Sequence, residues 1–154
     1  MPKTTPTKKT LYLYLISHNR DDIKTHTYVG CVEKFIKRLQ QHNGQLQGGP
    51  RITRRAAGSW DPVVVLKLPK ERNFDSKKLK KEWKQSSRGL ESRIRKGFSI
   101  ALQYNLTCYI MKSRKNTKGI KIFDYLDKRW DKSNIINLNE EDWTKITTNN
   151  FNVL

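Results

Sequence analysis

Near the start of the chain, two kinds of hydrophobic residue alternate with the period of two that is typical of a β-strand. The segment from Leu11 to Ser17 (LYLYLIS) alternates leucines with two tyrosines and an isoleucine, as expected of a strand with two different faces. Turn-forming residues follow from Asn19 to Asp22, and a second strand is predicted from Thr25 to Cys31. The short connection predicts that the two strands pair as a hairpin.

The hydrophobic period changes from two to between three and four after Cys31. This spacing predicts an amphipathic helix that ends near Gly44, a residue type that often follows a helix C-terminus. One face of the helix is apolar and the other is basic. The apolar residues are Val32, Phe35, Ile36 and Leu39, and the basic ones include Lys34, Lys37 and Arg38.

Further along, a third strand is predicted from Pro62 to Leu68 (PVVVLKL), with its proline at the first position, where a missing N–H does least harm. The stretch from Gln45 to Ser59 is expected to be an arginine-bearing loop. Helices are predicted from Ser76 to Ser86 and from Leu90 to Tyr104. Together these elements predict an α/β fold, with a small mixed or antiparallel sheet of three or slightly more strands flanked by helices.

The domain organisation follows from these elements. We expect one domain over residues 11–104, preceded by a flexible basic lead-in at residues 1–10. Residues 105–154 form a C-terminal extension whose aromatic content is high for a disordered segment. This extension is expected to pack on the domain or to bind a protein partner, and the oligomeric state is left open.

The net charge of the chain indicates which kind of molecule it binds. Lysines and arginines number 32 against 14 acidic residues, which gives a net charge of +18 and favours a polyanion, most simply nucleic acid. No apolar run is long enough to span a bilayer, so no membrane partner is expected. With Cys31 and Cys108 as the only cysteines, neither a disulfide framework nor a four-ligand zinc site can form within the chain. Two free thiols fit a reducing intracellular compartment, nucleus or cytoplasm, while a single disulfide between them and a viral origin are both left open.

Several motifs in the first two thirds of the chain occur in a recognisable order. Tyr28-Val29-Gly30 is followed by Arg38, Gln41-His42-Asn43-Gly44, Gly48-Gly49, Arg54, Trp60 and Glu82-Trp83. This order resembles the GIY-YIG nuclease family, and within it the branch that cuts branched DNA and usually appends a RING-type zinc domain. Thr10-Leu11-Tyr12 stands where the first half of the signature belongs, with threonine in place of its glycine and leucine in place of its β-branched residue.

The resemblance implies a metal-dependent endonuclease that hydrolyses DNA phosphodiesters during repair or recombination. Arg38 would bind the scissile phosphate, and Glu82 would hold one divalent metal ion, magnesium or alternatively manganese. Tyr12 or Tyr28 would activate the attacking water, and the family pattern favours Tyr12 as the base. His42 is a further candidate for proton transfer or for a phosphate contact. Each of these residues has an ordinary structural explanation when it is taken alone, and only their joint occurrence favours a nuclease.

The DNA itself is expected to be recognised by shape, as a branch or flap, although a plain duplex is also a candidate substrate. Contacts to phosphate carry no direct sequence information, and no separate reading domain is evident. Two alternatives stay open: a sequence-specific restriction or homing enzyme of the same family, and a DNA-binding module on the same fold that does not cleave. The candidate phosphate contacts are Lys34, Lys37, Arg51, Arg54, Arg55, Lys77, Lys78 and Lys81.

Overall fold

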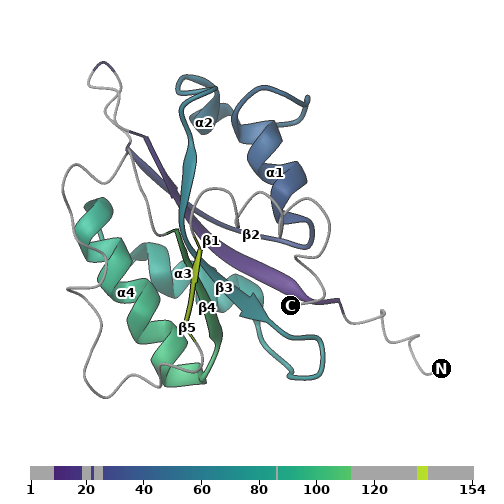
Figure 1. Cartoon of the computed structure of the whole chain (residues 1–154), viewed down its shortest axis with the longest axis vertical. Coiled ribbons are helices and arrows are strands. Elements are labelled where there is room, and N and C mark those ends of the chain that lie inside the picture. Colours follow the sequence, from purple (N-terminus) through teal and green to yellow (C-terminus); the bar gives the residue numbers. More distant parts are fainter. Residues whose placement is uncertain (1–8, 19–21, 23–25, 86, 112–134, 139–154) are drawn as a thin grey trace.

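The computed structural model describes residues 9–18, 22, 26–85, 87–111 and 135–138. A five-stranded sheet with strand order β2-β1-β3-β4-β5 forms the centre of the fold, and helices cover both of its faces (Figure 1). The strands are β1 (Leu11–Ser17), β2 (Thr27–Val32), β3 (Asp61–Leu68), β4 (Thr107–Met111) and β5 (Ile135–Leu138). The helices are α1 (Phe35–His42), α2 (Arg51–Arg54), α3 (Ser76–Gln85) and α4 (Gly89–Tyr104).

The hairpin expected from the alternating pattern is present. Strands β1 and β2 pair in antiparallel fashion, and β1 also pairs with β3, so the tyrosine-bearing strand lies between the other two predicted strands. The predicted helices are found within a few residues of their expected bounds. The loop from Gln45 to Ser59 contains one short helix, α2, that the sequence did not indicate.

The sheet extends beyond Tyr104, the predicted end of the domain. Asn105 adopts a left-handed conformation with φ of 53°, which ends α4 and lets the chain reverse into β4. Strand β4 pairs antiparallel with β3, and β5 pairs parallel with β4. Residues 107–111 and 135–138 therefore belong to the sheet itself. The remaining expectations for the extension, and the lead-in over residues 1–8, lie outside the described residues.

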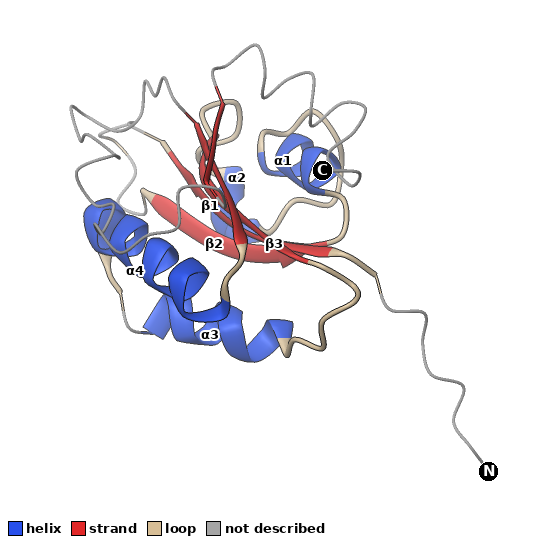
Figure 2. Cartoon of the chain, turned by 60° about the horizontal axis from the view of Figure 1, so that its bottom comes forward, coloured by secondary structure: helices blue, strands red, loops and turns tan. Residues whose placement is uncertain are grey.

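Each face of the sheet has its own hydrophobic core. Helices α3 and α4 cover one face, where Trp83 packs against Leu13, Leu15 and Ile94. Helices α1 and α2 lie on the other face, as Figure 2 shows, over a smaller core that contains several tyrosines. The period of two along β1 produces this division, because alternate side chains of a strand point to opposite faces. The leucines of β1 therefore support α3 and α4, and its tyrosines lie under α1.

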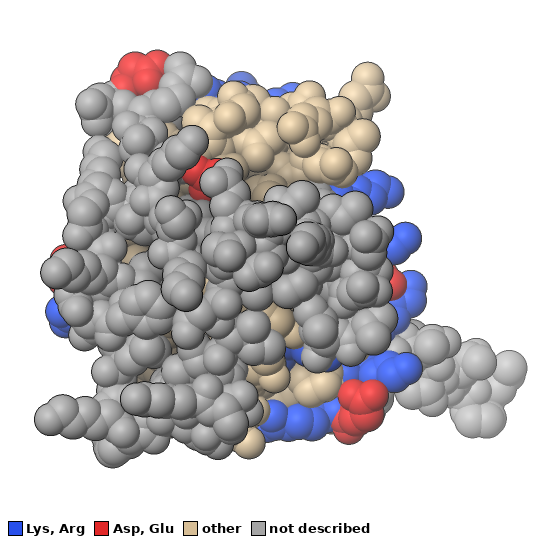
Figure 3. Space-filling model, in the orientation of Figure 1, with Lys and Arg blue, Asp and Glu red and all other residues tan. Residues whose placement is uncertain are grey.

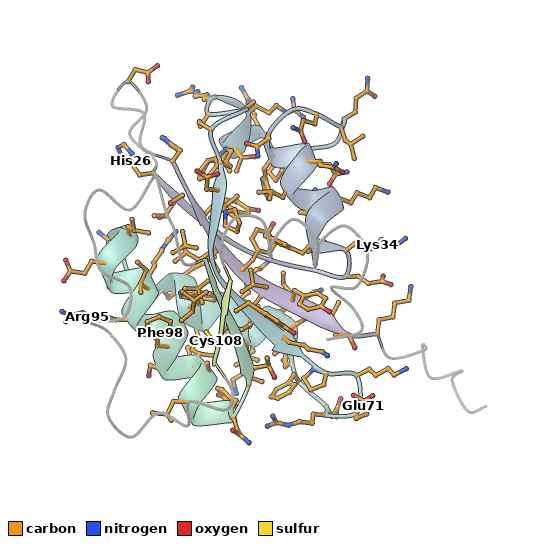
Figure 4. All side chains as sticks on the ribbon, in the orientation of Figure 1. His26, Lys34, Glu71, Arg95, Phe98 and Cys108 are labelled. Atoms are coloured by element: carbon orange, nitrogen blue, oxygen red, sulfur yellow. The ribbon has the colours of Figure 1, made fainter. Side chains whose placement is uncertain are left out.

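The two cysteines are free thiols. Cys108 on β4 is buried in the core beside α4, and burial raises the pKa of its thiol (Figure 4). Among the described helices, none is long and apolar enough to cross a membrane.

Candidate active site

The tyrosines and His42 meet on the α1 side of the sheet. Tyr14 on β1 is opposite Gly30 on β2, and Tyr28 is opposite Ile16, two pairs nearer the hairpin turn, so the two tyrosine side chains share a face. Their ring centroids are 6.2 Å apart. Helix α1 ends at His42, whose Nε2 is 2.8 Å from the Tyr14 hydroxyl and whose ring centroid is 4.8 Å from that of Tyr28. Tyr14 and His42 are buried, and Tyr28 is half-buried.

Gly30 provides the space that Tyr14 occupies. A Cβ atom built on Gly30 would overlap the Tyr14 ring and hydroxyl. The Tyr-Val-Gly sequence therefore has a physical basis in this fold. The first residue contributes an aromatic side chain to the site, and the third leaves room for the tyrosine of the neighbouring strand.

The hydrogen bonds around His42 determine its tautomer. The Thr53 hydroxyl donates to the carbonyl of Pro50 at 2.9 Å, so this oxygen can only accept from His42 Nδ1, which is also 2.9 Å away. Nδ1 therefore carries the proton, and Nε2 of the neutral ring is an acceptor. It follows that Tyr14 O–H donates to His42 Nε2. The result is a directed chain of three hydrogen bonds, from Tyr14 through His42 and Thr53 to the backbone.

The environment of His42 also favours its neutral form. Burial, and then the positive charge of Arg38, lower the pKa of His42 from 6.5 to about 4. Burial raises the pKa of Tyr14, and Tyr28 raises it further, while a hydrogen bond from Arg38 and its charge oppose this increase. Arg38 is thus close to the Tyr14 hydroxyl and to the imidazole. An anion bound by Arg38 would lie beside the hydroxyl that begins the hydrogen-bond chain.

Arg38 is held in place by its own helix and by the loop that follows it. Its Nη1 donates to Gln41 Oε1 at 2.9 Å and to the carbonyl of Gly48 at 3.2 Å. The next residue, Gly49, passes so close to the backbone of Gln41 that a Cβ atom there would overlap the Gln41 carbonyl. The Gly48-Gly49 pair therefore allows the loop to return over the C-terminus of α1.

Asn43 and Trp60 close the same loop. The Asn43 side chain accepts from the Trp60 backbone N–H at 2.8 Å and donates to the Trp60 carbonyl at 3.0 Å. The Trp60 indole N–H donates to the carbonyl of Thr53 at 2.9 Å. These contacts fix the position of Thr53, which in turn orients His42. In this structure the motif residues Asn43 and Trp60 act as positioning residues.

Tyr14, and not the predicted Tyr12, is the β1 tyrosine that lies beside Gly30 and His42. Both tyrosines point to the α1 face because they are two residues apart, but only Tyr14 is opposite Gly30 and contacts His42. Tyr12 is fully buried, and burial together with the neighbouring Tyr109 raises its pKa. The choice of Tyr12 as the water-activating residue therefore does not fit this geometry.

Glu82 also departs from its expected position. It lies on α3, in the layer that covers the opposite face of the sheet, and its carboxylate is 3.5 Å from Lys96 Nζ on α4. A magnesium site needs one or two carboxylates that reach the bound phosphate. Within the described part of the chain, no group of three or more His, Cys, Asp and Glu side chains is placed to hold a metal ion. In this structure the printed partner of the Glu82 carboxylate is Lys96, and the Tyr14 cluster lies on the other face of the sheet.

The predicted phosphate contacts are all exposed, but they divide between the two helical layers. Lysines and arginines project along the rim on the α1 side in Figure 3, and Lys34 points outward at the start of α1 in Figure 4. The predicted residues therefore do not form a single basic surface. Those on the α1 and α2 side are Lys34, Lys37, Arg51, Arg54 and Arg55, and those on α3 are Lys77, Lys78 and Lys81.

Two members of the cluster were not identified from the sequence. Tyr14 could have been found from the register of the hairpin. The register places a glycine opposite Tyr14, and a glycine opposite a tyrosine indicates a close approach of the ring. Thr53 has no such signal, since it lies in an arginine-rich loop and is brought to His42 only by the folding of that loop. No protein-family model matches the chain, and no curated protein matches it in sequence.

Proposed function

We propose that this protein is a DNA endonuclease of the GIY-YIG type that hydrolyses phosphodiester bonds. The observation that carries the proposal is the directed hydrogen-bond chain from Tyr14 through His42 to Thr53, with Arg38 beside the Tyr14 hydroxyl. A structural tyrosine needs neither a buried histidine acceptor nor an adjacent guanidinium. A hydrolase needs both a proton acceptor and a positive charge at the phosphoryl oxygens.

The hydrogen-bond directions define a route for a proton. Tyr14 uses its own proton to bond to His42, so an oxygen lone pair can accept a proton from a water molecule. As the water oxygen attacks phosphorus, its proton passes to Tyr14 and the Tyr14 proton passes to Nε2 of His42. The P–O bond to the leaving oxygen breaks, and that oxygen is protonated by solvent. This route avoids a free tyrosinate, which is rare at neutral pH because the unperturbed pKa of tyrosine is about 10.

Arg38 is the proposed ligand of the scissile phosphate. Its guanidinium is fixed by Gln41 and Gly48 before any substrate binds, so little side-chain entropy is lost on binding. The net charge of +18 favours DNA as the polyanion, and recognition of branched or flap shapes remains part of the proposal. A sequence-specific restriction or homing enzyme is the alternative within the same chemistry.

A divalent metal, magnesium or manganese, is retained as part of the proposal, and none of the steps above depends on it. When bound, such an ion would supply charge neutralisation at the phosphate and the leaving oxygen. Since Glu82 is paired with Lys96, assigning the metal to Glu82 requires that pair to break when substrate binds.

The Glu82–Lys96 pair also favours a second candidate, a module on this fold that binds DNA without cutting it. Such a protein would keep Arg38 and its other exposed lysines and arginines but would have no use for a carboxylate at the phosphate. Glu82→Gln separates the two candidates when cleavage and binding are both measured. Loss of cleavage with binding retained supports a metal role for Glu82, and wild-type cleavage removes Glu82 from the metal proposal.

The experiment that tests the proposed function compares Tyr14→Phe with Tyr12→Phe. Both variants lose one buried hydroxyl, but only the first breaks the chain to His42. Substrates are a flap, a fork, a four-way junction and a plain duplex, each in several unrelated sequences, with magnesium, manganese or a chelator. We expect Tyr14→Phe to slow cleavage by about 10²- to 10⁴-fold, the usual worth of acid–base catalysis, and Tyr12→Phe to cut near the wild-type rate.

Three results would count against parts of this proposal. Binding by the wild-type protein without cleavage under any metal condition would favour the non-cleaving module. Cleavage of plain duplex that follows one sequence and ignores branch points would favour the restriction or homing alternative. Equal rates for Tyr14→Phe and the wild type would remove the hydrogen-bond chain from the mechanism.

A further inference from the structure

A pocket of about 510 Å³ lies at the β2 edge of the sheet, where the two helical layers approach each other. Strand β2 contributes Tyr28, α2 contributes Ile52, and the α3–α4 region contributes Lys84, Arg88 and Arg93. None of the residues that line the pocket is acidic. Tyr28 belongs both to this pocket and to the candidate active site, so the two sites are adjacent.

Two polar atoms in the pocket wall are buried without a hydrogen-bond partner among the described residues. They are Arg93 Nε and His26 Nδ1. Arg93 is anchored by its Nη1, which donates to Thr27 Oγ1 at 3.0 Å. Native proteins rarely leave a buried donor unsatisfied, and each exception needs an explanation, such as a bound water, an ion or a functional role. An acceptor with negative charge would satisfy the Arg93 donor.

The start of α4 adds to the positive potential of the pocket. Arg88 and Gly89 line the pocket and begin a helix of 16 residues, and no side chain caps its N-terminus. First-turn amides have no partners within the helix, and the helix dipole favours an anion at this end. The acidic residue of the first turn, Glu91, is not part of the pocket wall and pairs with Arg95 at 3.2 Å on the exposed surface.

The remaining feature of the pocket is apolar. Ile52 is 57% exposed and lines the pocket together with the cationic residues, so it offers an aliphatic contact to a bound molecule. Inorganic phosphate would gain nothing from this contact, whereas the sugar or base attached to a phosphodiester would cover it. The combination of an anion site and an exposed aliphatic side chain therefore favours a nucleotide unit of a DNA strand.

We propose that this pocket binds a phosphodiester of the second strand of a branched DNA substrate, while Arg38 binds the strand that is cut. The inference rests on the proposed function. The basis for assigning a different strand is position, since Arg38 lies in the α1 layer and Lys84, Arg88 and Arg93 lie in the α3–α4 layer, with the edge of β2 between them. Near a branch point the two strands separate, so two phosphate sites on either side of one edge select a branch.

The test removes two exposed charges from the pocket without changing the candidate active site. The double variant Lys84→Gln and Arg88→Gln is compared with Lys70→Gln and Arg95→Gln, which removes one lysine and one arginine from exposed positions outside the pocket. Binding to a flap and to a single strand of the same sequence is measured in chelator at several salt concentrations, so that cleavage is not required. Thermal unfolding verifies that both double variants fold.

Counterion release gives the expected magnitude. One phosphate contact is worth roughly 5.5-fold in affinity at about 0.15 M salt, so two lost contacts predict a weakening of about 30-fold for the flap and a salt slope reduced by about 2. Binding to the single strand should weaken much less in the pocket variant. The control double variant should weaken binding to both DNAs equally. A loss for the flap no larger than that of the control, or an equal loss for flap and single strand, would overturn the inference.

Two further readouts separate related explanations. The wild-type protein could bind the flap without cutting any substrate, while the pocket variant still loses its preference for the flap. This result would support the second-strand site and contradict the proposed catalysis. Titration with inorganic phosphate, followed through the Arg93 Nε–H NMR signal, distinguishes a site for small anions. Saturation by phosphate alone at low concentration would contradict a site built for a DNA strand, and we expect the signal to shift only with DNA.

Discussion

Burial of a neutral His42 should make the stability of this protein depend on pH in a defined window. The pKa of His42 is lowered to about 4 in the folded protein by burial and by Arg38, against 6.5 for an ordinary histidine. Above pH 6.5 the ring is neutral in both the folded and the unfolded chain. As the pH falls from 6.5 toward 4, the unfolded chain binds a proton that the folded protein excludes, so stability is lost in that interval.

The magnitude follows from the two pKa values. The difference between 6.5 and about 4 corresponds to a loss of about 3 kcal/mol in the free energy of unfolding once the pH is below both values. This is a large part of the 5 to 15 kcal/mol that holds a typical domain together. The pH dependence of stability sums contributions from the whole protein, so a comparison with a variant is needed to isolate His42.

The assay is urea unfolding of the wild type and of His42→Gln between pH 7 and pH 4. Trp60 is a natural fluorescent reporter, because its ring centroid is 6.5 Å from that of His42. We expect the difference in stability between the two proteins to shrink by about 3 kcal/mol over this range, because only the wild type carries the His42 titration. His26→Gln, at a residue of the same type outside the hydrogen-bond chain, is the control. If the curves of the wild type and His42→Gln run parallel, His42 is not held neutral by the fold, and the tautomer derived above is wrong.

Two further substitutions test how the site is built. Gly30→Ala should destabilise the fold by about 1 to 3 kcal/mol in urea unfolding, since the new methyl group overlaps the Tyr14 ring, and it should also reduce any cleavage. A stability equal to the wild type would mean that Tyr14 does not need this space. Asn43→Ala should cost a similar amount, because it leaves the Trp60 backbone N–H and carbonyl without their partners. Gln45→Ala, at an exposed neighbouring position, should leave the unfolding midpoint unchanged, and an equal loss in both variants would contradict this role for Asn43.

The sequence by itself determined the elements and the division of the sheet into two faces. Alternation along β1 separates the leucines from the tyrosines, and this local property survives in the fold because a strand has a period of two. Helix α1 was equally readable, because its apolar residues return with the helical period and Asn43-Gly44 ends it. The same patterns placed Arg38 and His42 on that helix. A hydrophobic period predicts which face of a strand or helix a residue occupies, but it does not predict which residue of another element it contacts.

The identity of the neighbours was decided by the tertiary structure. Tyr12 and Tyr14 satisfy the same alternation, and only the pairing of β1 with β2 places Gly30 opposite Tyr14. Thr53 reaches His42 because the loop after α1 folds back, which depends on contacts between residues far apart in the chain. Glu82 pairs with Lys96 because α3 and α4 pack together, and no periodicity along α3 indicates that partner. Register, loop closure and helix packing are long-range properties, so a site assembled from them is fixed only when the whole fold is formed.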